Sequence, residues 1–208
     1  MNGSSLKRRN DLASWLKSLF GRDSPVEAPV AQLEMLRDHL DELLTKVVPE
    51  GYALRCYQEG DALAWCEIME GNVGRNWTEE KFHEQMASDP RFHAEGLFFA
   101  TYNNQPVASA CAWRMAIEEK IIGSVHMVGA LSDHRGVGLG HLVNAAVLLK
   151  LKEQGFGKAH LKTDDWRLAA INSYLKAGFQ PLNTHISHAE RWEVVLKNIA
   201  AYEAKSGR

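Results

Sequence analysis

Cysteine is scarce in this chain, whose 208 residues contain three, Cys56, Cys66 and Cys111. Their number is odd, they are widely spaced, and no two form a Cys-x-x-Cys pair. This pattern argues against a disulfide framework and a zinc ribbon. Unpaired cysteines are typical of proteins in a reducing compartment, so we expect a cytoplasmic protein.

Long apolar runs are absent as well. The longest stretch, residues 142–149, is interrupted by Asn144, whereas about 20 apolar residues are needed to cross a bilayer. The apolar residues near the start are interrupted by Ser14, Lys17 and Ser18, so they do not form the core of a signal peptide. The sequence predicts no targeting segment, no membrane span and no membrane partner.

Neither sign of charge dominates. The chain has 24 Lys and Arg against 26 Asp and Glu, a formal net charge of −2 at pH 7. This balance gives no general attraction to a phosphate backbone, which argues against a nucleic-acid partner. Apolar residues make up 45% of the chain and charged residues 24%, as in an ordinary folded protein. The length fits one domain, or one domain with an extension.

Apolar residues recur at helical spacing before residue 50. A first pattern covers residues 12–20, and a stronger one runs from Val30 to Val47 and ends at Pro49. We therefore expect a helical extension over residues 1–50 and a separate domain over 51–208. The extension could pack on its own domain, which we favour, or serve as the arm of a homodimer.

From residue 51 onward, strand and helix patterns alternate. The expected strands are 52–57, 97–102, 107–115, 121–131, 159–163 and a last one starting at Phe179. The expected helices start at Asp61 and Thr78 and cover 138–154, 165–177 and 189–204. This order predicts an α+β (mixed α/β) domain with a central antiparallel meander.

The segment Arg135-Gly-Val-Gly-Leu-Gly140 lies between an expected strand and a long expected helix. The first turn of a helix has backbone N–H groups without partners and the positive end of the helix dipole. Glycines let the backbone approach an anion closely, and Arg135 adds a charged donor. The segment is therefore a candidate phosphate cradle.

Two common phosphate-binding patterns fit this cradle poorly. A P-loop needs Gly-Lys-Ser/Thr, but Gly140 is followed by His141 and Leu142. A dinucleotide fingerprint needs Gly-x-Gly-x-x-Gly, and the spacing here is Gly-x-Gly-x-Gly. The pattern that fits is Gln/Arg-x-x-Gly-x-Gly/Ala, met by Arg135, Gly138 and Gly140. It resembles the pyrophosphate loop of the GNAT superfamily of acyl-CoA-dependent N-acyltransferases.

A second segment strengthens the resemblance. The family's next motif, Ala-Ile-x-x-Tyr-x-Lys-x-Gly-Phe, is matched by Ala170, Ile171, Tyr174, Lys176, Gly178 and Phe179. The resemblance covers residues 52–188, and residues 125–155 are most similar to the mycothiol synthase branch. The chain departs from the pattern at Arg167, where many members have Asn. Arg167 either contacts the phosphates of the ligand or faces solvent.

The resemblance implies a GNAT-like fold, with a central, mostly antiparallel sheet of six or seven strands flanked by helices. It also implies acetyl transfer from acetyl-CoA, a cosubstrate, to a primary amine of a small molecule or peptide, by direct attack in a ternary complex. Strand residues near the cradle would bind the pantetheine amides where this strand separates from 159–163, and one of their backbone groups would polarise the thioester carbonyl. The implied cofactor-binding residues are Val128, Gly129, Ala130, Arg135, Gly136, Val137, Gly138, Leu139, Gly140 and His141.

Tyr174 and His126 are the candidate catalytic residues. The resemblance makes Tyr174 the proton donor to the departing CoA thiolate, and its pKa near 10 keeps it protonated at neutral pH; the alternative is a core tyrosine. Strand alternation places Ser124, His126 and Val128 on one face, which carries no Glu. His126 titrates in the range of a general base. A water relay could replace it, and His126 would then face solvent or a neighbour.

Other interpretations remain open. A non-catalytic acyl-CoA-binding or sensing module would use the same cradle. His185 and His188 are three residues apart, but no third ligand lies nearby, so we expect no metal. Trp77, Trp113 and Trp166 could line an acceptor pocket, although core packing is the usual role of tryptophan. Residues 70–78 and 181–188 are expected to surround the acceptor.

Overall fold

The structure is a computed structural model that describes residues 30–43, 47–117 and 120–206. Residues 32–208 form one compact unit, which contains all the helices and strands of the described residues. The helix predicted over 12–20 lies outside the described residues. In the part of the chain that is described, no helix is both long and apolar enough to cross a membrane.

The described residues form a seven-stranded sheet in the order β2-β3-β4-β5-β6-β1-β7. Its strands are β1 (Leu33–Arg37), β2 (Tyr52–Cys56), β3 (Leu97–Tyr102), β4 (Gln105–Ile117), β5 (Lys120–Ala130), β6 (Ala159–Thr163) and β7 (Gln180–Leu182). Neighbouring strands are antiparallel except β5 and β6, which are parallel. The predicted fold, a mostly antiparallel sheet with helices, is confirmed.

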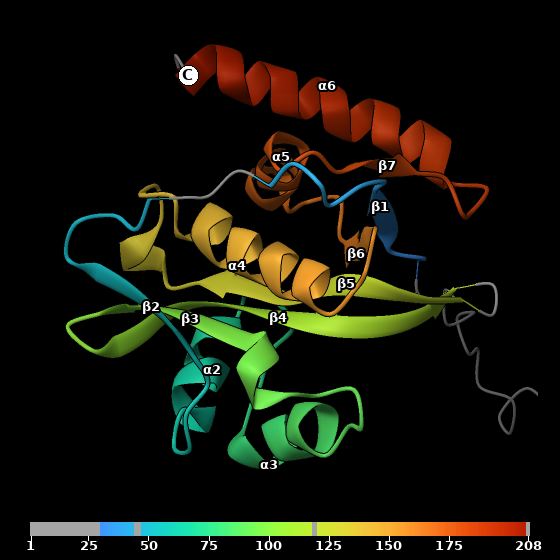
Figure 1. Ribbon diagram of the computed structural model, residues 1–208. Helices are drawn as coiled ribbons and strands as arrows, with labels where there is room; N and C mark the ends of the chain where they lie inside the picture. Colours follow the sequence, from blue (N-terminus) through green and yellow to red (C-terminus); the bar gives the residue numbers. More distant parts are fainter. Residues whose placement is uncertain (1–29, 44–46, 118–119, 207–208) are drawn as a thin grey trace, which may run out of the picture. The chain divides into compact units, whose positions relative to one another are not determined.

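Helices cover both faces of the sheet (Figure 1). On one face lie α4 (Leu139–Glu153) and α5 (Leu168–Lys176), with α6 (His188–Ser206) packed beyond α5. On the other lie α2 (Ala62–Met69) and α3 (Glu79–Phe82), which continues as a π-helical turn, His83–Ala87. The sheet therefore separates two apolar cores, one beneath α4 and one beneath α2.

Local signals explain why several elements match the prediction. Asn103 and Asn104 have φ of 49° and 65° and form the β3–β4 hairpin turn, because Asn tolerates the left-handed conformation better than most residues. Thr78 is the N-cap of α3, and its hydroxyl accepts a hydrogen bond from the Lys81 N–H at 3.3 Å. Gly155, with φ of 85°, follows α4.

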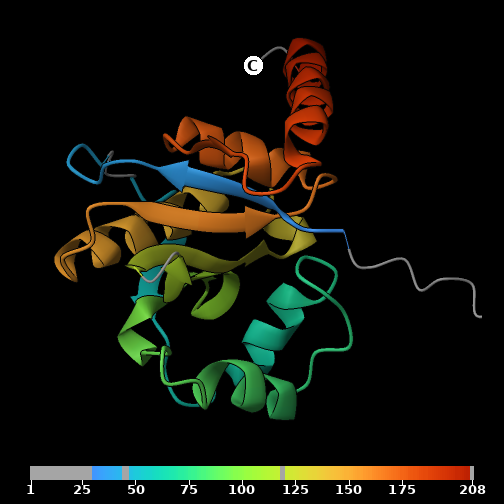
Figure 2. The ribbon, with the colours of Figure 1, turned by 90° about the vertical axis from the view of Figure 1, so that its right-hand side faces the viewer.

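The helix predicted from Val30 to Val47 is wrong over residues 33–37, which form β1 in the interior of the sheet. Figure 2 shows β1 and β6 as neighbouring arrows that run in opposite directions. Apolar residues in this stretch fit both helical and alternating spacing, and the buried side of β1 alternates. Pairing with β6 and β7 decides between them, because tertiary contacts override local propensity. The predicted boundary near residue 50 thus lies inside the compact unit. The segment that could have served as a dimer arm is a strand, not a helix, over residues 33–37.

Candidate active site

The parallel strands β5 and β6 separate soon after they meet. Among the residues that the structure describes, they pair at two positions only, Gly123 with Ala159 and Ser124 with His160. Strand β5 then continues to Ala130, held on its other side by β4. Its backbone edge toward β6 is therefore open over the predicted binding residues Val128–Ala130. We call this gap between the two strands the β5–β6 opening.

A β-bulge in β5 lies beside this opening. Ser109 of β4 faces Gly129, but Cys111 faces His126, so two residues of β5 lie opposite one of β4. Met127 has the unusual φ of 53°. The bulge reverses the alternation of side chains: Val128 packs in the core beneath α4, whereas His126 contacts Trp113 in the core beneath α2. The prediction that Ser124, His126 and Val128 share one face is therefore wrong for Val128.

The glycine-rich loop has the shape of a cradle. Gly136 and Gly138 have φ of 85° and 94°, in the left-handed region that favours glycine. No atom lies within 4 Å of the place that a Cβ would occupy at Gly136, Gly138 or Gly140. Gly138 begins α4, whose first backbone N–H groups have no partner within the helix. The loop thus has space and donors for an anion.

Side chains of the predicted loop residues play different parts. Leu139 is buried in the core, while Val137 is exposed, so Leu139 can offer a ligand its backbone only. The Arg135 guanidinium bonds to Asn72 Oδ1 at 3.0 Å and the Ala130 carbonyl at 3.3 Å. Asn72 donates to the same carbonyl at 3.0 Å. Arg135 therefore ties the loop to the end of β5 and to the segment after α2.

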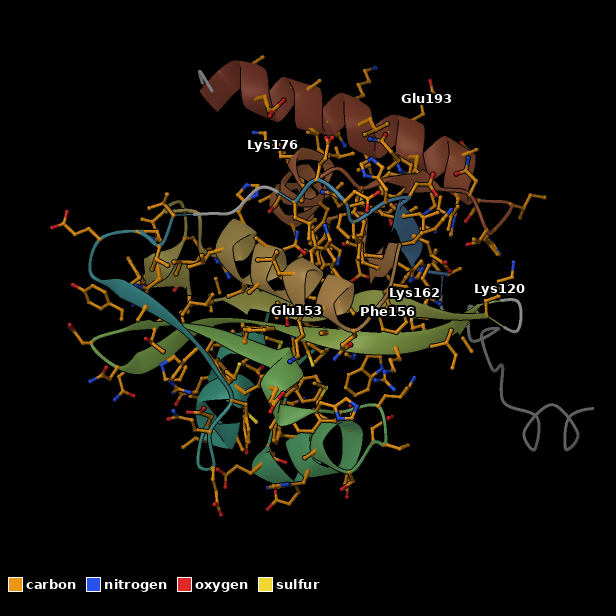
Figure 3. The ribbon with its side chains drawn as sticks, viewed as in Figure 1. Lys120, Glu153, Phe156, Lys162, Lys176 and Glu193 are labelled. Carbon is orange, nitrogen blue, oxygen red and sulfur yellow. The ribbon has the colours of Figure 1, made fainter. Side chains whose placement is uncertain are left out.

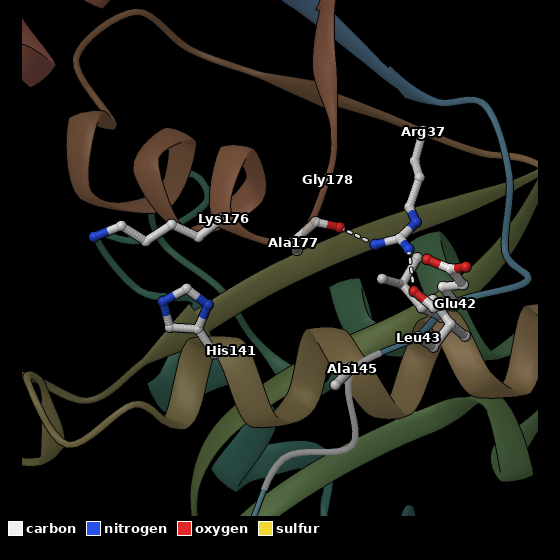
Figure 4. A pocket seen from close by; sticks show the side chains of 9 residues that line it. Arg37, Glu42, Leu43, His141, Ala145, Lys176, Ala177 and Gly178 are labelled. Atoms are coloured by element: carbon white, nitrogen blue, oxygen red, sulfur yellow. Dashed lines mark hydrogen bonds between the residues drawn. The ribbon is translucent and has the colours of Figure 1, made fainter.

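His141 and Lys176 border a cavity of about 210 Å³ between α4 and α5 (Figure 4). His141 Nδ1 and Ser173 Oγ are 3.1 Å apart, which links the two helices. Across the cavity, Arg37 of β1 donates to the carbonyls of Ala177 and, at 2.6 Å, Glu42. Strand β1, which the sequence does not predict, therefore holds the end of α5 through Arg37.

Tyr174 is 3% exposed and packs on Phe179, with ring centroids 6.1 Å apart. Burial raises the pKa of the Tyr174 hydroxyl, and the positive charge of Arg167 partly opposes this. The hydroxyl is therefore protonated at neutral pH, as a proton donor must be. Tyr174 is a core residue, as the alternative interpretation expected; its role as proton donor stays a prediction.

Arg167 points into the β5–β6 opening. Its Nη2 donates to the Val128 carbonyl oxygen at 2.7 Å, and the side chain is half-buried. The alternative that Arg167 faces solvent is therefore wrong. No local pattern could have indicated this contact, because it joins residues 39 positions apart.

His126 belongs to a layered cluster beneath the bulge. The centroid of its ring lies 4.9 Å from that of Trp113. The Arg91 guanidinium lies over the same tryptophan ring, 5.0 Å from its centroid. Asp89 holds Arg91 through Oδ1 at 2.8 Å. Burial, assisted by the charge of Arg91, lowers the pKa of His126 to about 4. His126 is thus neutral at pH 7 and a weak base.

The three tryptophans lie in different surroundings. Trp113 is 4% exposed and forms part of the core. Trp77 packs edge-to-face on Trp65 at 5.0 Å, while Trp166 is 67% exposed beside Arg167. Of these three, Trp166 therefore has a surface free for an acceptor. Among the described residues, no group of three or more His, Cys, Asp or Glu is placed to hold a metal.

A buried polar pair near the closed end of the opening was not indicated by the sequence. His160 is completely buried, and its Nε2 lies 2.8 Å from Glu34 Oε2. Lys162, labelled in Figure 3, approaches the other oxygen of this carboxylate at 3.4 Å. The pair joins β1 to β6 across 126 residues, and the sequence does not indicate it, because its pattern predicts a helix where β1 lies.

The bulged strand, the opening beside it and the glycine loop that begins α4 together define an acyltransferase fold. The family described as "Acetyltransferase (GNAT) family" matches residues 62–179, more than half of the chain. The chain belongs to this family.

Relatives and solved structures agree with the assignment. The chain is 31% identical over 157 residues to a mycothiol acetyltransferase of Nocardia farcinica, covering 69% of this chain and 50% of the relative. It thus spans about half the length of the curated relatives it matches. A GCN5-related N-acetyltransferase from Sphaerobacter thermophilus has a TM-score of 0.58 at 20% identity, covering 82% of this chain and 53% of that one. A NatC complex bound to Gag peptide and CoA contains a chain with a TM-score of 0.53 at 15% identity, covering 66% and 92%.

Proposed function

We propose that this protein is an N-acetyltransferase that transfers an acetyl group from acetyl-CoA to a primary amine by direct attack in a ternary complex. The observation that carries the proposal is the meeting of two features at the end of β5. The backbone edge of the β5–β6 opening ends at Ala130, and the glycine loop follows from Arg135. One extended ligand with a diphosphate and an amide-bearing arm fits both.

The residues present suit such a ligand. The backbone N–H groups of Gly136–His141 would hold the diphosphate, because the space above the three glycines is open and the dipole of a 15-residue helix favours an anion there. The backbone of Val128–Ala130 would bind the amides of the arm. Arg135 contributes positive charge at the loop while it anchors the loop to Asn72.

Acetyl-CoA supplies an activated thioester. Backbone N–H groups of Val128–Ala130 would stabilise negative charge on the carbonyl oxygen. Tyr174 keeps its proton at neutral pH and would donate it to the sulfur that departs. The amine must lose a proton before it attacks. His126 is neutral and can accept a hydrogen bond, but its low pKa favours a relay through water to a stronger acceptor.

The acceptor would approach beside the opening. We place its pocket between residues 70–78 and 181–188, with the exposed Trp166 ring at its border. The three cysteines are free thiols, which supports a cytoplasmic location as part of the proposal.

Thiol release distinguishes an enzyme from a binding module. The purified chain is mixed with acetyl-CoA and a panel of small-molecule and peptide amines, and free thiol is followed with time. We expect amine-dependent release of CoA. Calorimetry with acetyl-CoA provides the control. Tight binding without turnover for every amine would favour the non-catalytic acyl-CoA-binding module, and no binding would overturn the site itself.

A further inference from the structure

Arg167 occupies a backbone position that the proposed ligand needs. In the β5–β6 opening, the Val128 carbonyl is turned away from β4 and toward the gap, and Arg167 Nη2 donates to it at 2.7 Å. Arg167 begins α5 and makes no capping bond with its own side chain. The side chain therefore crosses the opening instead of closing the end of its helix.

The charges around Arg167 do not account for this position. The two carboxylates that precede it are engaged elsewhere: Asp164 accepts a hydrogen bond from Gln32 at 3.0 Å, and Asp165 pairs with Arg191. Its guanidinium lies 6.0 Å over the exposed ring of Trp166 and near the Tyr174 hydroxyl. The partner of this half-buried charge is thus a neutral carbonyl in the binding groove.

The Val128 carbonyl is a partly buried acceptor, and losing its hydrogen bond to a charged donor costs free energy. In the free protein Arg167 supplies the donor. When an acyl-CoA binds, an amide N–H of the pantetheine arm is the donor that fits the same strand edge. A carbonyl oxygen can accept two hydrogen bonds, but the guanidinium lies in the opening that the arm has to enter, so the two donors compete for the same space.

We propose that Arg167 is a latch on the pantetheine groove, which bonds to the Val128 carbonyl in the free protein and must release it when the arm of an acyl-CoA enters. The inference rests on the proposed function. It makes Arg167 a residue that sets the affinity for the arm and not for the nucleotide.

Calorimetry with two ligands tests the latch. CoA carries the arm, whereas adenosine 3′-phosphate 5′-diphosphate has the same phosphates without it. Arg167→Leu should bind CoA about five- to tenfold more tightly, since a charged competitor is lost, and bind the nucleotide as the parent does. Arg167→Lys keeps a charged donor and should restore most of the parental affinity. Lys158→Leu removes an exposed ion pair with Asp38 and should leave the affinity for both ligands unchanged.

Kinetics provide a second readout. In Arg167→Leu the KM for acetyl-CoA should fall while kcat does not rise. Equal weakening of both ligands would show that Arg167 contacts phosphate, and unchanged affinity for both would show that the side chain has no part in binding; either result overturns the latch. If the parent binds neither ligand, the proposed function is overturned and the latch with it, whereas a parent that binds both leaves the function standing and tests the latch alone. Arg167→Gln, which keeps a neutral donor, replaces the Leu variant if that one does not fold.

Discussion

Backbone atoms provide most of the ligand contacts that we propose, so the effect of a substitution depends on where its new side chain goes. At Gly138 any side chain is strained, since φ is 94°. At Gly140 the backbone is ordinary and the space is open. A substitution at Gly138 is therefore expected to affect folding as well as binding, whereas one at Gly140 should affect binding alone.

Gly140→Glu should abolish CoA binding with little loss of stability. Its carboxylate would project into the open space above the loop and place negative charge where a diphosphate has to bind. Calorimetry with CoA and a thermal melt measure the two effects. Gly140→Ala is the matched control and should retain binding in part. Parental CoA affinity in the Glu variant would contradict the assignment of the loop.

Tyr174→Phe should lower kcat by about 10²–10⁴-fold, the usual contribution of a positioned general acid. The ring and its packing on Phe179 are retained, so CoA affinity and melting temperature should change little. Thiol release under conditions in which acyl transfer limits turnover is the measurement. A parental kcat there would mean that the thiolate leaves unaided. A melting temperature several degrees lower would mean that the hydroxyl is chiefly structural.

His126 should make stability depend on pH. Its pKa is about 4 in the folded protein and about 6.5 when unfolded. Between these values the unfolded chain takes up a proton that the folded chain does not, so the free energy of unfolding falls as pH drops from 6.5 toward 4, by up to about 3 kcal/mol. Urea unfolding at several pH values should show a shallower dependence for His126→Gln. Parallel curves for the two proteins would contradict the burial of this ring.

At the scale of secondary-structure elements, β1 and α5 depend on each other. Arg37 is 8% exposed and donates to three carbonyls, those of His39, Glu42 and Ala177. A Cβ on Gly178 would lie 2.9 Å from the Arg37 guanidinium. The end of the helix that carries Tyr174 is thus built around a side chain from a strand far away in sequence.

Arg37→Met should destabilise the protein by about 3 kcal/mol, because three partly buried carbonyls lose the donors that a single buried side chain supplies. Chemical unfolding measures the change. Lys158→Met removes an exposed ion pair with Asp38 and should cost less than about 1 kcal/mol. If both variants unfold at the same denaturant concentration, Arg37 does not hold the two elements together.

Local patterns were sufficient for elements with strong signals of their own. The helix predicted over 138–154 is observed as Leu139–Glu153, and the strand predicted over 159–163 is β6. The bulge at Met127 had no signal, since Met seldom adopts a positive φ. The contact of Arg167 with Val128 and the pair of Glu34 with His160 join distant parts of the chain. The pair of Glu34 with His160 follows from the position of β1 beside β6.

At the scale of the whole molecule, the proposed site lies where β5, β6, α4 and α5 converge. A ligand bound there would contact both strands that diverge and the helix that follows one of them. Local opening of any of these elements would release it. Binding should therefore stabilise the compact unit as a whole.

Saturating CoA should raise the melting temperature. At a concentration of 100 times its Kd, a ligand stabilises the folded state by about 2.7 kcal/mol, which corresponds to about 5–10 °C for a domain of this size. Adenosine 3′-phosphate 5′-diphosphate at the same multiple of its own Kd should produce an equal shift. Gly140→Glu should show none. A shift with CoA in that variant would place the ligand elsewhere.

The position of β1 has a consequence for how the chain is made. Of the strands in the described sheet this one is synthesised first, yet it belongs between β6 and β7, and Glu34 meets His160 only 126 residues later. A ribosome adds about 5–20 residues per second, so β1 waits roughly 6–25 s for its first partner. During that interval Leu33 and Met35, both fully buried in the finished sheet, have no strand to cover them. The sheet is therefore completed only after β6 and β7 have been synthesised, and among its strands β1 is the one that a chaperone has the longest time to bind.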